Sequence, residues 1–364
     1  MKRVLFVTNY AAPYKVEFYD ELSQYLDVTV LFSDTIEEQK HRSGDWFTKG
    51  KGQFHAVQLS RNAGKMKGEN LCLDVIDWLK KPFDAYVVCG YSSPTMMLAI
   101  AYLRINRIPF YMEVDGGLIR ENSGPKYWFK KLLVSQATAW ISSGKHTTKY
   151  LVHYGAKENA VYHYPFTSLW KRDLLDEIPS AEEKQILRRK LGMPETKIVL
   201  YVGRYDPKKG MDDLLHVVPE LKHDTGVYFV GGEPKEEHLA FCRENQIANA
   251  HFVGFKRKQE LADYYKAADV LVLPTKSDVW GLVINEAMAF GLPVITTDQC
   301  VAGLELVENG ETGYIVPVDD IQALSWRIND ILSGDCAAMG AKALEKVRPY
   351  TIENMAKVHA EIFE

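Results

Sequence analysis

The feature that most constrains this sequence is the alternation of short apolar runs with longer helical patterns along its whole length. The apolar runs cover residues 4–8, 28–32, 85–89, 110–114, 139–142, 198–202, 227–230, 251–253, 270–273 and 294–296. Most of these runs are unbroken, without the in/out alternation of a half-exposed strand, which is typical of strands buried on both faces of a parallel sheet. Helical patterns such as 261–268 and 283–290 separate them, so we expect doubly wound α/β layers.

The series of strands and helices restarts near the middle of the chain. A linker-like stretch at 165–179 leads into a helix that Ser180 and Glu183 cap and that Gly192 closes. A chain of 364 residues is too long for one ordinary core and is comfortable for two. We therefore predict two Rossmann-like domains with a hinge near 165–169. The predicted domains are residues 1–165, with a C-terminal helix within 350–364 packing back on them, and residues 166–349.

Composition argues against several classes of protein. Hydrophobic residues make up 46% and charged residues 25% of the chain, which is ordinary for a soluble globular protein. The net charge of −4 gives no overall argument for a nucleic-acid partner. No apolar stretch approaches the length of about 18 residues that spans a membrane, and the N-terminal apolar run is too short for a signal peptide. The five cysteines form no C-x-x-C pair, so we expect a reducing, cytoplasmic compartment and no structural zinc.

A basic loop follows the apolar run 198–202 and reads G-R-Y-D-P-K-K-G, from Gly203 to Gly210. In open α/β sheets ligands bind at the carboxyl ends of strands, so residues that directly follow a strand are candidates for a site. Gly203 lets the backbone turn close to a ligand. Arg204 offers a planar fork of donors and Lys209 a point charge, a pair that suits a diphosphate. Taken alone, the loop is equally compatible with a solvated basic turn.

A second loop follows the run 270–273 and contains Asp278 and Gly281, with Glu286 in the helical pattern beyond. Gly281 permits a phosphate to approach free backbone N–H groups and the positive end of a helix. Carboxylates accept hydrogen bonds from hydroxyls, so Asp278 and Glu286 suit a sugar and a ribose. A solvated helix carboxylate is the simpler interpretation of Glu286. Its apolar neighbours instead predict a largely buried helix, in which a carboxylate needs partners.

Together these motifs resemble family 4 of the retaining glycosyltransferases, which have the GT-B fold. The shared patterns are G-R-x(4)-K-G at 203–210, F-V-G-F at 252–255 and W-G-x(4)-E-A-M-A-x-G-x-P-V-I at 280–295. The resemblance is dense over about 200–320 and loose in the first half of the chain. It implies an α/β protein with two Rossmann-like, doubly wound domains that face a central cleft. The first domain would bind the acceptor and the second the nucleotide sugar.

The resemblance also implies roles for the matching residues. Arg204 and Lys209 would hold the donor diphosphate, and Glu286 would hold the ribose hydroxyls. Asp278 stands where the family usually has Glu and would contact a sugar hydroxyl, either through a water or from a shifted loop. These four are also the catalytic candidates of the second half. The remaining candidates line the base and sugar-phosphate pocket, mainly through their backbone: Gly203, Gly254, Phe255, Trp280, Gly281, Leu282 and Val283.

The first half departs from the family pattern. Its first loop, at 9–14, lacks the Gly-Gly pair with which many members approach a phosphate. At the end of the run 110–114 the family often has a His facing the reacting sugar, and Asp115 is our catalytic candidate for that place. An aspartate followed by two glycines is also typical of a simple turn. The turn at 142–145 resembles a family pattern and is more typical of a structural role than of a catalytic one.

Transfer from a nucleotide sugar requires a stabilised leaving group, an oriented acceptor and exclusion of water. Arg204, Lys209 and the helix start would stabilise the departing diphosphate, and the sequence contains no D-x-D carboxylate pair. We therefore expect no metal and no cofactor, with the nucleotide sugar as co-substrate. The resemblance implies retention at the anomeric carbon and, by family frequency, a UDP-sugar. The expected function is transfer of a hexose-type sugar to a glycan or lipid-linked acceptor in bacterial cell-surface polysaccharide or glycolipid synthesis.

Two stretches combine basic with aromatic residues. Residues 40–67 contain seven Lys and Arg residues, one acid, Trp46 and Phe47, and residues 126–133 read K-Y-W-F-K-K-L-L. Such segments can rest on anionic lipid, so we expect peripheral contact with the inner face of the cell membrane. A mobile solvated loop and a core-facing amphipathic helix are the respective alternatives. The basic residues of the first stretch are Lys40, Arg42, Lys49, Lys51, Arg61, Lys65 and Lys67.

Other functions remain compatible with parts of this pattern. A GT-B relative such as a nucleotide-sugar epimerase or a sugar phosphorylase would share the fold, although the full motif at 286–295 disfavours both. A non-catalytic nucleotide-sugar-binding subunit is suggested only by Asp278 and by the missing Gly-Gly pair. A dinucleotide oxidoreductase is weaker still, because no G-x-G-x-x-G follows the first apolar run.

Overall fold

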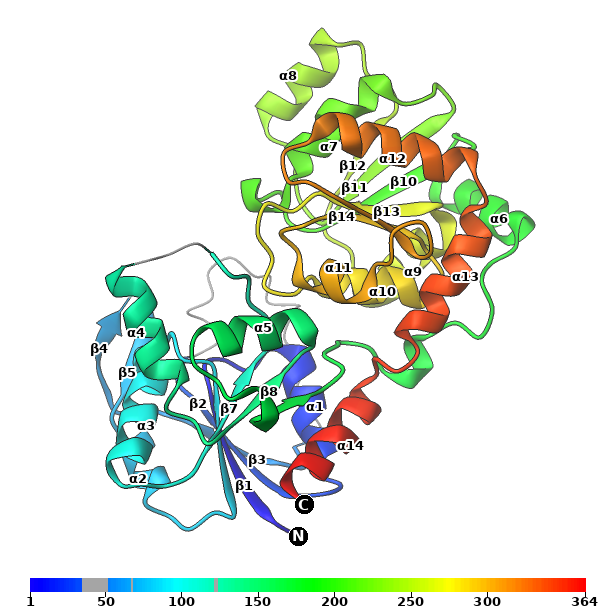
Figure 1. The fold of residues 1–364 in the computed structure, drawn as a ribbon. Coiled ribbons are helices and arrows are strands. Elements are labelled where there is room, and N and C mark those ends of the chain that lie inside the picture. The colour runs from blue at the N-terminus through cyan, green and yellow to red at the C-terminus, as the bar shows by residue number, and fades with distance from the viewer. Residues whose placement is uncertain (35–51, 67, 121–123) are drawn as a thin grey trace. The chain divides into compact units, whose positions relative to one another are not determined.

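The computed structural model describes residues 1–34, 52–66, 68–120 and 124–364. These residues form two compact units (Figure 1). Unit 1 consists of Met1–Thr167 together with Tyr350–Glu364, and unit 2 consists of Ser168–Pro349. The predicted boundary after residue 165 therefore differs from the observed one by two residues, and the observed boundary falls within the predicted hinge.

Unit 1 alternates strands and helices and ends with a helix from the far end of the chain. Its strands are β1 (Arg3–Thr8), β2 (Asp27–Phe32), β3 (His55–Gln58), β4 (Asn62–Met66), β5 (Glu69–Cys72), β6 (Ala85–Cys89), β7 (Tyr111–Val114), β8 (Ala139–Ser142) and β9 (Val161–His163). Its helices are α1 (Pro13–Leu22), α2 (Val75–Leu79), α3 (Pro94–Ile105), α4 (Pro125–Val134), α5 (Lys145–His153) and α14 (Ile352–Phe363).

The main sheet of unit 1 is parallel, with the order β3-β2-β1-β6-β7-β8-β9, while β4 and β5 form a separate antiparallel pair. The chain moves outward from β1 to β3 on one side and then from β6 to β9 on the other. The order therefore reverses between β1 and β6. In a doubly wound sheet the ligand crevice lies outside the carboxyl ends of the strands at such a reversal.

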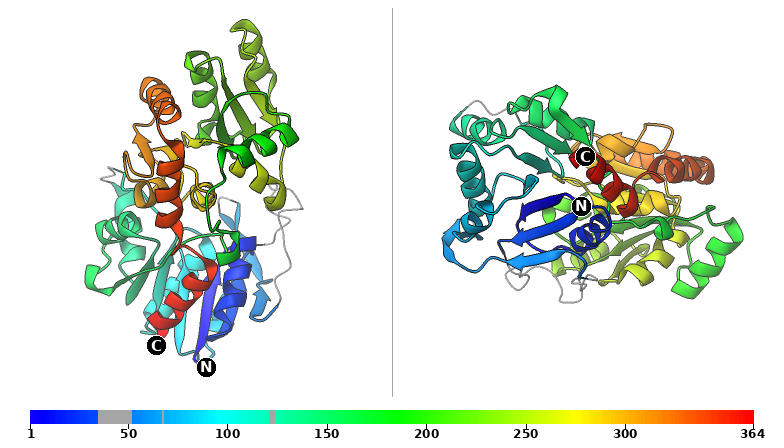
Figure 2. Two further views of the ribbon diagram at one scale, coloured as in Figure 1. Left: turned by 90° about the vertical axis from the view of Figure 1, so that its right-hand side faces the viewer. Right: turned by 90° about the horizontal axis from the view of Figure 1, so that it is seen from below.

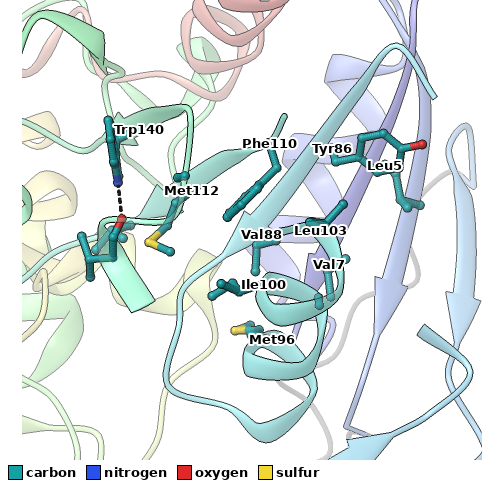
Figure 3. Close-up of a cluster of buried hydrophobic side chains, with 14 of the residues drawn as sticks. Leu5, Val7, Tyr86, Val88, Met96, Ile100, Leu103, Phe110, Met112 and Trp140 are labelled. Carbon is teal, nitrogen blue, oxygen red and sulfur yellow. Dashed lines mark hydrogen bonds between the residues drawn. The ribbon is translucent and has the colours of Figure 1, made fainter. Parts of the chain in front are cut away.

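Alternate residues of the central strands supply two separate apolar cores. Leu5 and Val7 of β1 lie in the same buried cluster as Met96 and Ile100 of α3 (Figure 3). Trp140 of β8 lies in that cluster too, and its indole Nε1 donates to the carbonyl of Val134 at 2.9 Å. Successive strand residues point to opposite faces, and a strand with apolar residues on both faces is held between two layers of helix.

The opposite face of the unit 1 sheet is covered by α1 and α14. Phe6 of β1 packs against Tyr19 of α1, with ring centroids 5.1 Å apart, and against Phe363 of α14, with centroids 6.1 Å apart. The buried residues of α14 recur at i, i+3, i+4 and i+7, the spacing of a single apolar face. Figure 2 shows α14 and β1 side by side with the two chain termini close together. The side chain of Lys2 donates to the carbonyl of Phe363 at 2.7 Å.

Unit 2 repeats the alternation with a purely parallel sheet. Its strands are β10 (Lys197–Val202), β11 (Thr225–Val230), β12 (Ala250–Val253), β13 (Val270–Leu273), β14 (Val294–Thr297) and β15 (Gly313–Val316). Its helices are α6 (Ala181–Leu191), α7 (Met211–Val217), α8 (Glu236–Glu244), α9 (Lys258–Ala267), α10 (Leu282–Ala289), α11 (Val301–Leu306), α12 (Ile321–Ser333) and α13 (Cys336–Val347). The strand order is β12-β11-β10-β13-β14-β15.

Helix α6 shows how local sequence signals and buried charges fix this unit. Ser180 and Glu183 form the predicted capping box, and Gly192 ends the helix in the left-handed conformation. Arg188 of α6 donates to Asp269 at 2.8 Å, and Asp269 also accepts from the backbone N–H of Ile198 at 2.8 Å. A buried carboxylate with several donors is paired, so α6 is tied to the start of β10.

The ten predicted strands are all present, with ends that differ by at most two residues. The sequence analysis missed β3, β4, β5, β9 and β15, which are short and stand at sheet edges or in the separate hairpin. The polar, exposed residues of β4 carry no apolar run to reveal it. β15 is a short apolar segment, Gly313–Val316, that starts at a glycine. Cys89 is buried, as its place in an apolar run predicts, and all five cysteines are free thiols.

Candidate active site

The order of strands in unit 2 reverses between β10 and β13. From β10 the chain proceeds through β11 to β12 on one side, and then returns to β13 and proceeds to β15 on the other side. Crevices for ligands form at the carboxyl ends of strands where the order reverses. The two loops singled out by the sequence, at 203–210 and 274–281, follow these two neighbouring strands, so the fold brings the two motifs together.

The loop at 203–210 is fixed against the loop that follows β13. The carbonyl of Lys208 accepts hydrogen bonds from the Thr275 hydroxyl and from the Lys276 N–H, both at 2.8 Å. Gly210 has φ of 69°, and a Cβ added there would lie 1.8 Å from the carbonyl oxygen of Pro274. No side chain fits in that space. Hydrogen bonds and close backbone packing therefore fix the conformation of the basic loop at the edge of the sheet.

The charged side chains of the two loops meet. The ammonium of Lys209 lies 2.5 Å from Asp278 Oδ2, and 24% and 15% of the two side chains are exposed. Arg204 is more open, with 55% of its side chain exposed and its guanidinium 3.9 Å from Asp206. The structure thus places three of the predicted residues in one region, with Arg204 free to turn toward an anion and Lys209 partnered by Asp278.

Helix α10 begins at this edge of the sheet. Its N-cap, Gly281, has φ of 105°, and an added Cβ would lie 2.7 Å from Cys300 Sγ. The amides of Leu282 and Val283 stand in the first turn, where the helix provides no carbonyl for them. They lie at the positive end of the helix dipole, an arrangement that suits a phosphate. The structure therefore places Gly281, Leu282 and Val283 at the start of a helix, and their role in anion binding stays a prediction.

Trp280 directly precedes the N-cap of α10 and stabilises the start of this helix. Its side chain is buried, and the indole N–H donates to Asn285 Oδ1 at 2.8 Å. Its carbonyl accepts from the N–H of Ala302 at 2.9 Å and from the thiol of Cys300 at 3.0 Å. Trp280 therefore supports the turn through both its ring and its carbonyl.

Glu286 lies one turn into α10 and is held by two hydroxyl groups. Tyr265 donates to Oε2 at 2.9 Å and Ser168 to Oε1 at 3.3 Å. Burial raises the pKa of the Glu286 carboxyl, and the two hydrogen bonds and the charge of Lys258 offset this only in part. A carboxylate with such partners differs from a solvated helix carboxylate, the simpler interpretation of the sequence. The sequence analysis missed Tyr265 and Ser168, which lie far from any motif.

A third loop at the carboxyl ends of the unit 2 strands begins with Gly254 and Phe255, directly after β12. The ring of Phe255 is 52% exposed, so it is available to a flat ligand group. A Cβ at Gly254 would lie 2.9 Å from Glu233 Oε1. Glu233 belongs to the loop after β11.

The sequence analysis overlooked that loop after β11. Gly231 has φ of 118°, and its added Cβ would lie 2.8 Å from the carbonyl oxygen of Gly203. A Cβ on Gly232 would lie 2.7 Å from the ring of Tyr205. The signal was present, because two glycines directly follow the apolar run 227–230, just as Gly203 follows β10.

The predicted residues of the first half all lie in unit 1. Asp115 directly follows β7, at the carboxyl edge of that sheet, and 25% of its side chain is exposed. The serine hydroxyls of the turn at 142–145 make hydrogen bonds within the protein that stabilise the turn. Ser143 bonds to Thr147 at 2.8 Å, and Ser142 donates to the carbonyl of Gly144 at 2.8 Å.

The two basic aromatic stretches fare differently. Five of the seven basic residues in the stretch at 40–67 lie outside the described residues, namely Lys40, Arg42, Lys49, Lys51 and Lys67. Arg61 is described and pairs with Asp77 at 2.9 Å. The stretch at 126–133 forms most of α4. Within the described ranges, no helix is long and apolar enough to cross a membrane. In the same part of the chain, no three His, Cys, Asp or Glu side chains are grouped to hold a metal ion.

Comparison with known families identifies this arrangement. The model of the family described as "Glycosyl transferases group 1" matches residues 183–351, which contain every motif at the edge of the unit 2 sheet. The matched region is thus similar to the group 1 glycosyltransferases. The family match covers nearly all of unit 2, so the charged loops, the start of α10 and Glu286 are all within the group 1 region.

Individual relatives are similar over about half of the chain. D-inositol 3-phosphate glycosyltransferase of Streptomyces scabiei is 33% identical over 208 residues, which are 52% of this chain and 46% of the relative. A Mycolicibacterium smegmatis protein, GDP-mannose-dependent alpha-(1-6)-phosphatidylinositol monomannoside mannosyltransferase, is 32% identical over 177 residues, 44% of this chain and 46% of that one. The chain thus spans about half the length of these relatives.

Solved structures extend the likeness to the whole fold. Anabaena Alr3699/HepE in complex with UDP superposes with a TM-score of 0.76 at 16% identity, covering 99% of each chain. Two Rossmann-like units with parallel sheets in this order make the chain a GT-B protein. The predicted fold class is therefore confirmed.

The environment of Glu286 predicts a gain of stability when its charge is removed. A carboxyl group whose pKa is higher in the folded state binds its proton more tightly when folded. The free energy of unfolding is therefore largest below the unfolded value, near about 4.3, and falls as pH rises through the raised folded value. Glu286→Gln cannot ionise, so its free energy of unfolding should exceed that of the wild type at pH 8 and match it near pH 4.

Urea denaturation across this pH range would measure the difference. Glu345→Gln is the matched control, since that carboxylate is 77% exposed and should leave the pH dependence unchanged. A Glu286→Gln protein that is less stable than the wild type at pH 8 would contradict this assignment of burial as the dominant influence.

Proposed function

We propose that the protein transfers a hexose-type sugar from a nucleoside diphosphate sugar, a UDP-sugar first of all, to a glycan or lipid-linked acceptor. The observation that carries this proposal is the meeting of the two charged loops at the strand reversal of unit 2. There the ammonium of Lys209, the guanidinium of Arg204 and the N-terminus of α10 stand at one edge of the sheet. The similarity of this region to the group 1 glycosyltransferases supports it.

In this proposal the leaving diphosphate replaces Asp278 as the partner of Lys209. Its phosphates bind the amides of Leu282 and Val283 and the side chains of Arg204 and Lys209. Positive groups aimed at the oxygen where negative charge develops lower the barrier to departure. Asp278, released from Lys209, then accepts a hydrogen bond from a hydroxyl of the donor sugar. Because the Asp side chain is shorter than Glu, we expect a water to bridge Asp278 and the sugar hydroxyl, or the loop to shift toward the sugar.

Glu286 would accept hydrogen bonds from the two ribose hydroxyls. Tyr265 and Ser168 already donate to it, which shows that the carboxylate is oriented by hydroxyl donors. Burial raises its pKa, and hydrogen bonds from a ribose would favour the charged form. Phe255, exposed on the neighbouring loop, offers a face for the base.

The relatives narrow the range of donors and acceptors to be tested. The Anabaena structure contains UDP, while the mycobacterial relative is named for GDP-mannose, so UDP- and GDP-sugars are the donors to compare. The names of the two relatives point to inositol phosphate and phosphatidylinositol glycosides as acceptors of those proteins. A lipid-linked or polyol acceptor in surface glycolipid or polysaccharide synthesis fits this proposal, with retention at the anomeric carbon.

We further propose that transfer needs no metal ion. Two cationic side chains and a helix N-terminus can balance a diphosphate without one. An epimerase would act on the donor alone and return an altered nucleotide sugar. A non-catalytic subunit would bind the nucleotide and release none from the donor.

The face of α4 supports a membrane as the place of the acceptor. Pro125, Trp128, Phe129 and Leu132 recur at i, i+3, i+4 and i+7 and are all exposed, with 64%, 50% and 60% exposure for Trp128, Phe129 and Leu132. Such a row is normally buried against the protein. Lys126, Lys130 and Lys131 flank this row. On its other side α4 packs Tyr127, Leu133 and Val134 against the unit 1 core, as the core-facing alternative expects. The exposed apolar row with flanking lysines matches an anionic lipid surface.

Substitution of the charged site should reduce transfer without abolishing the fold. Lys209→Ala and Glu286→Gln should each lower kcat/KM for nucleoside diphosphate release. The expected loss of transition-state stabilisation is about 2–4 kcal/mol for each variant. Lys190→Ala, an exposed lysine of α6, is the control and should retain wild-type turnover. The assay is diphosphate release from a panel of UDP- and GDP-sugars with product analysis, with and without chelator. Wild-type turnover in both site variants would refute the assignment, and a metal requirement would refute metal independence.

The face of α4 should govern binding to vesicles. Trp128→Ser with Phe129→Ser should weaken co-sedimentation with phosphatidylglycerol vesicles by on the order of tenfold or more, since burying each aromatic is worth about 1.5–3 kcal/mol. Trp326→Ser removes an equally exposed tryptophan, 60% exposed in unit 2, and should leave binding unchanged. Equal binding of the double variant and the wild type would exclude this face as the contact.

A further inference from the structure

A second cluster of charged groups lies at the carboxyl edge of the unit 1 sheet. Lys15 belongs to the first turn of α1, directly after the β1 loop, and its ammonium lies 3.5 Å from Asp115 Oδ2. The other carboxylate oxygen, Oδ1, accepts from the Tyr164 hydroxyl at 2.8 Å. Lys15 also donates to the Thr8 hydroxyl at 3.3 Å. Both oxygens of Asp115 are therefore oriented by the protein.

The surroundings of Lys15 favour its charged form. Burial alone would lower the pKa of this lysine, but the Asp115 carboxylate, followed by Tyr14, Cys89 and Glu113, outweighs burial and raises it above its usual value. Only 13% of the Lys15 side chain is exposed, against 25% for Asp115. The carboxylate is thus the accessible member of the pair, and the ammonium stands behind it.

Glu113 faces a histidine, while Lys15 lies against Asp115. Glu113 belongs to β7, and Asp115 is the first residue after that strand. The ring of His359, from α14, donates through Nδ1 to the carbonyl of Met355 at 2.8 Å, and its Nε2 faces Glu113 Oε2 at 3.4 Å. Both of these facing atoms are buried and have no hydrogen-bond partner among the described residues.

The His359 ring also contacts two aromatic side chains. Phe18 and Tyr164 each lie with a ring centroid 4.7 Å from the imidazole, in edge-on arrangements. His359 therefore packs against Glu113 and aromatic rings, and Lys15 is the cation that lies against Asp115.

We propose that Lys15 is a positioning residue of the transfer reaction, which fixes the Asp115 carboxylate and directs it toward the hydroxyl of a sugar at the edge of the unit 1 sheet. The inference rests on the proposed glycosyl transfer. Asp115 accepts a hydrogen bond from the hydroxyl, and no proton transfer is invoked. A buried ion pair alone is weak support for a stabilising role, because apolar pairs of similar size often stabilise as well. The partial exposure of Asp115 beside the reversal between β1 and β6 favours a ligand.

Several groups in this cluster titrate or carry charge, and each contributes to the pH response. Glu113 comes from β7 and Asp115 directly follows it. Cys89 comes from β6, His359 from α14, and Tyr164 from the segment after β9. The remaining members come from α1: Tyr14, Lys15 and Tyr19. Burial raises the pKa of the Cys89 thiol and of the Tyr19 and Tyr164 hydroxyls, so these three stay neutral at physiological pH. Asp115, with 25% of its side chain exposed, is the partly accessible carboxylate that lies against Lys15.

The test compares Lys15→Met, which removes the charge, with Lys15→Arg, which keeps it. Diphosphate release from the donor that the wild type uses best is measured from pH 5 to 9. In Lys15→Met the acidic limb of kcat/KM should move up by about one pH unit or more, since an opposite charge at this distance shifts a carboxyl by about 1–3 units. Lys15→Arg should restore the wild-type profile. UDP affinity, set by unit 2, should stay unchanged in both.

Lys184→Met is the matched control. Lys184 is 16% exposed and lies 3.5 Å from Asp269 in unit 2, so it resembles Lys15 in burial and pairing without adjoining this cluster. It should change stability and leave the pH profile alone. A uniform loss at every pH in Lys15→Met, or a profile equal to the wild type, would overturn the proposal by leaving Lys15 a structural role only.

A second measurement separates this inference from the proposed function. Carbon-13 NMR of labelled aspartate carboxyls, with the Asp115 signal assigned by its loss in Asp115→Asn, follows the charge of Asp115 without any substrate. The signal should titrate at higher pH in Lys15→Met than in the wild type. An unchanged titration refutes the inference even if the wild type transfers sugar. A wild type that releases no diphosphate from any donor refutes the proposed function instead.

Discussion

The parallel pairing of β10 with both β11 and β13 is the constraint on which the candidate site of unit 2 depends. Because the chain leaves β10 in one direction and returns to its other side, the loops after β10 and β13 emerge next to each other. Strands buried on both faces can be built only from unbroken apolar runs. The polar residues needed for chemistry are therefore confined to the strand ends, where Gly203 and Pro274 begin the two loops.

This arrangement also brings opposite charges together at the carboxyl edge of each sheet. Lys209 and Asp278 pair at 2.5 Å, and Lys15 and Asp115 make a similar pair in unit 1. Each unit thus presents a lysine and an aspartate beside the reversal of its sheet. In unit 2 the pair stands next to the N-terminus of α10, which favours an anion. In unit 1 the lysine is the more buried partner, which leaves the carboxylate for a hydroxyl.

The sequence was sufficient to predict the central strands and the donor-side loops, because each depends on residues close together in the chain. The unbroken runs reveal β10 and β13, and Arg204, Lys209 and Asp278 directly follow them. It was not sufficient for partners that arrive from distant helices. Tyr265 on α9 orients Glu286, and Lys15 on α1 orients Asp115, yet neither belongs to a recognisable pattern. Edge strands such as β4 were missed because their residues are polar and exposed.

The central claim is that a nucleoside diphosphate binds at the carboxyl edge of the unit 2 sheet. Hydrogen–deuterium exchange of the whole protein, measured with and without UDP or GDP, tests it most directly. The account predicts slower exchange in peptides that contain residues 203–210 and 278–286, where the glycine-rich turn and the first amides of α10 would contact the phosphates. Unchanged exchange in both segments, with protection elsewhere in the chain, would contradict it.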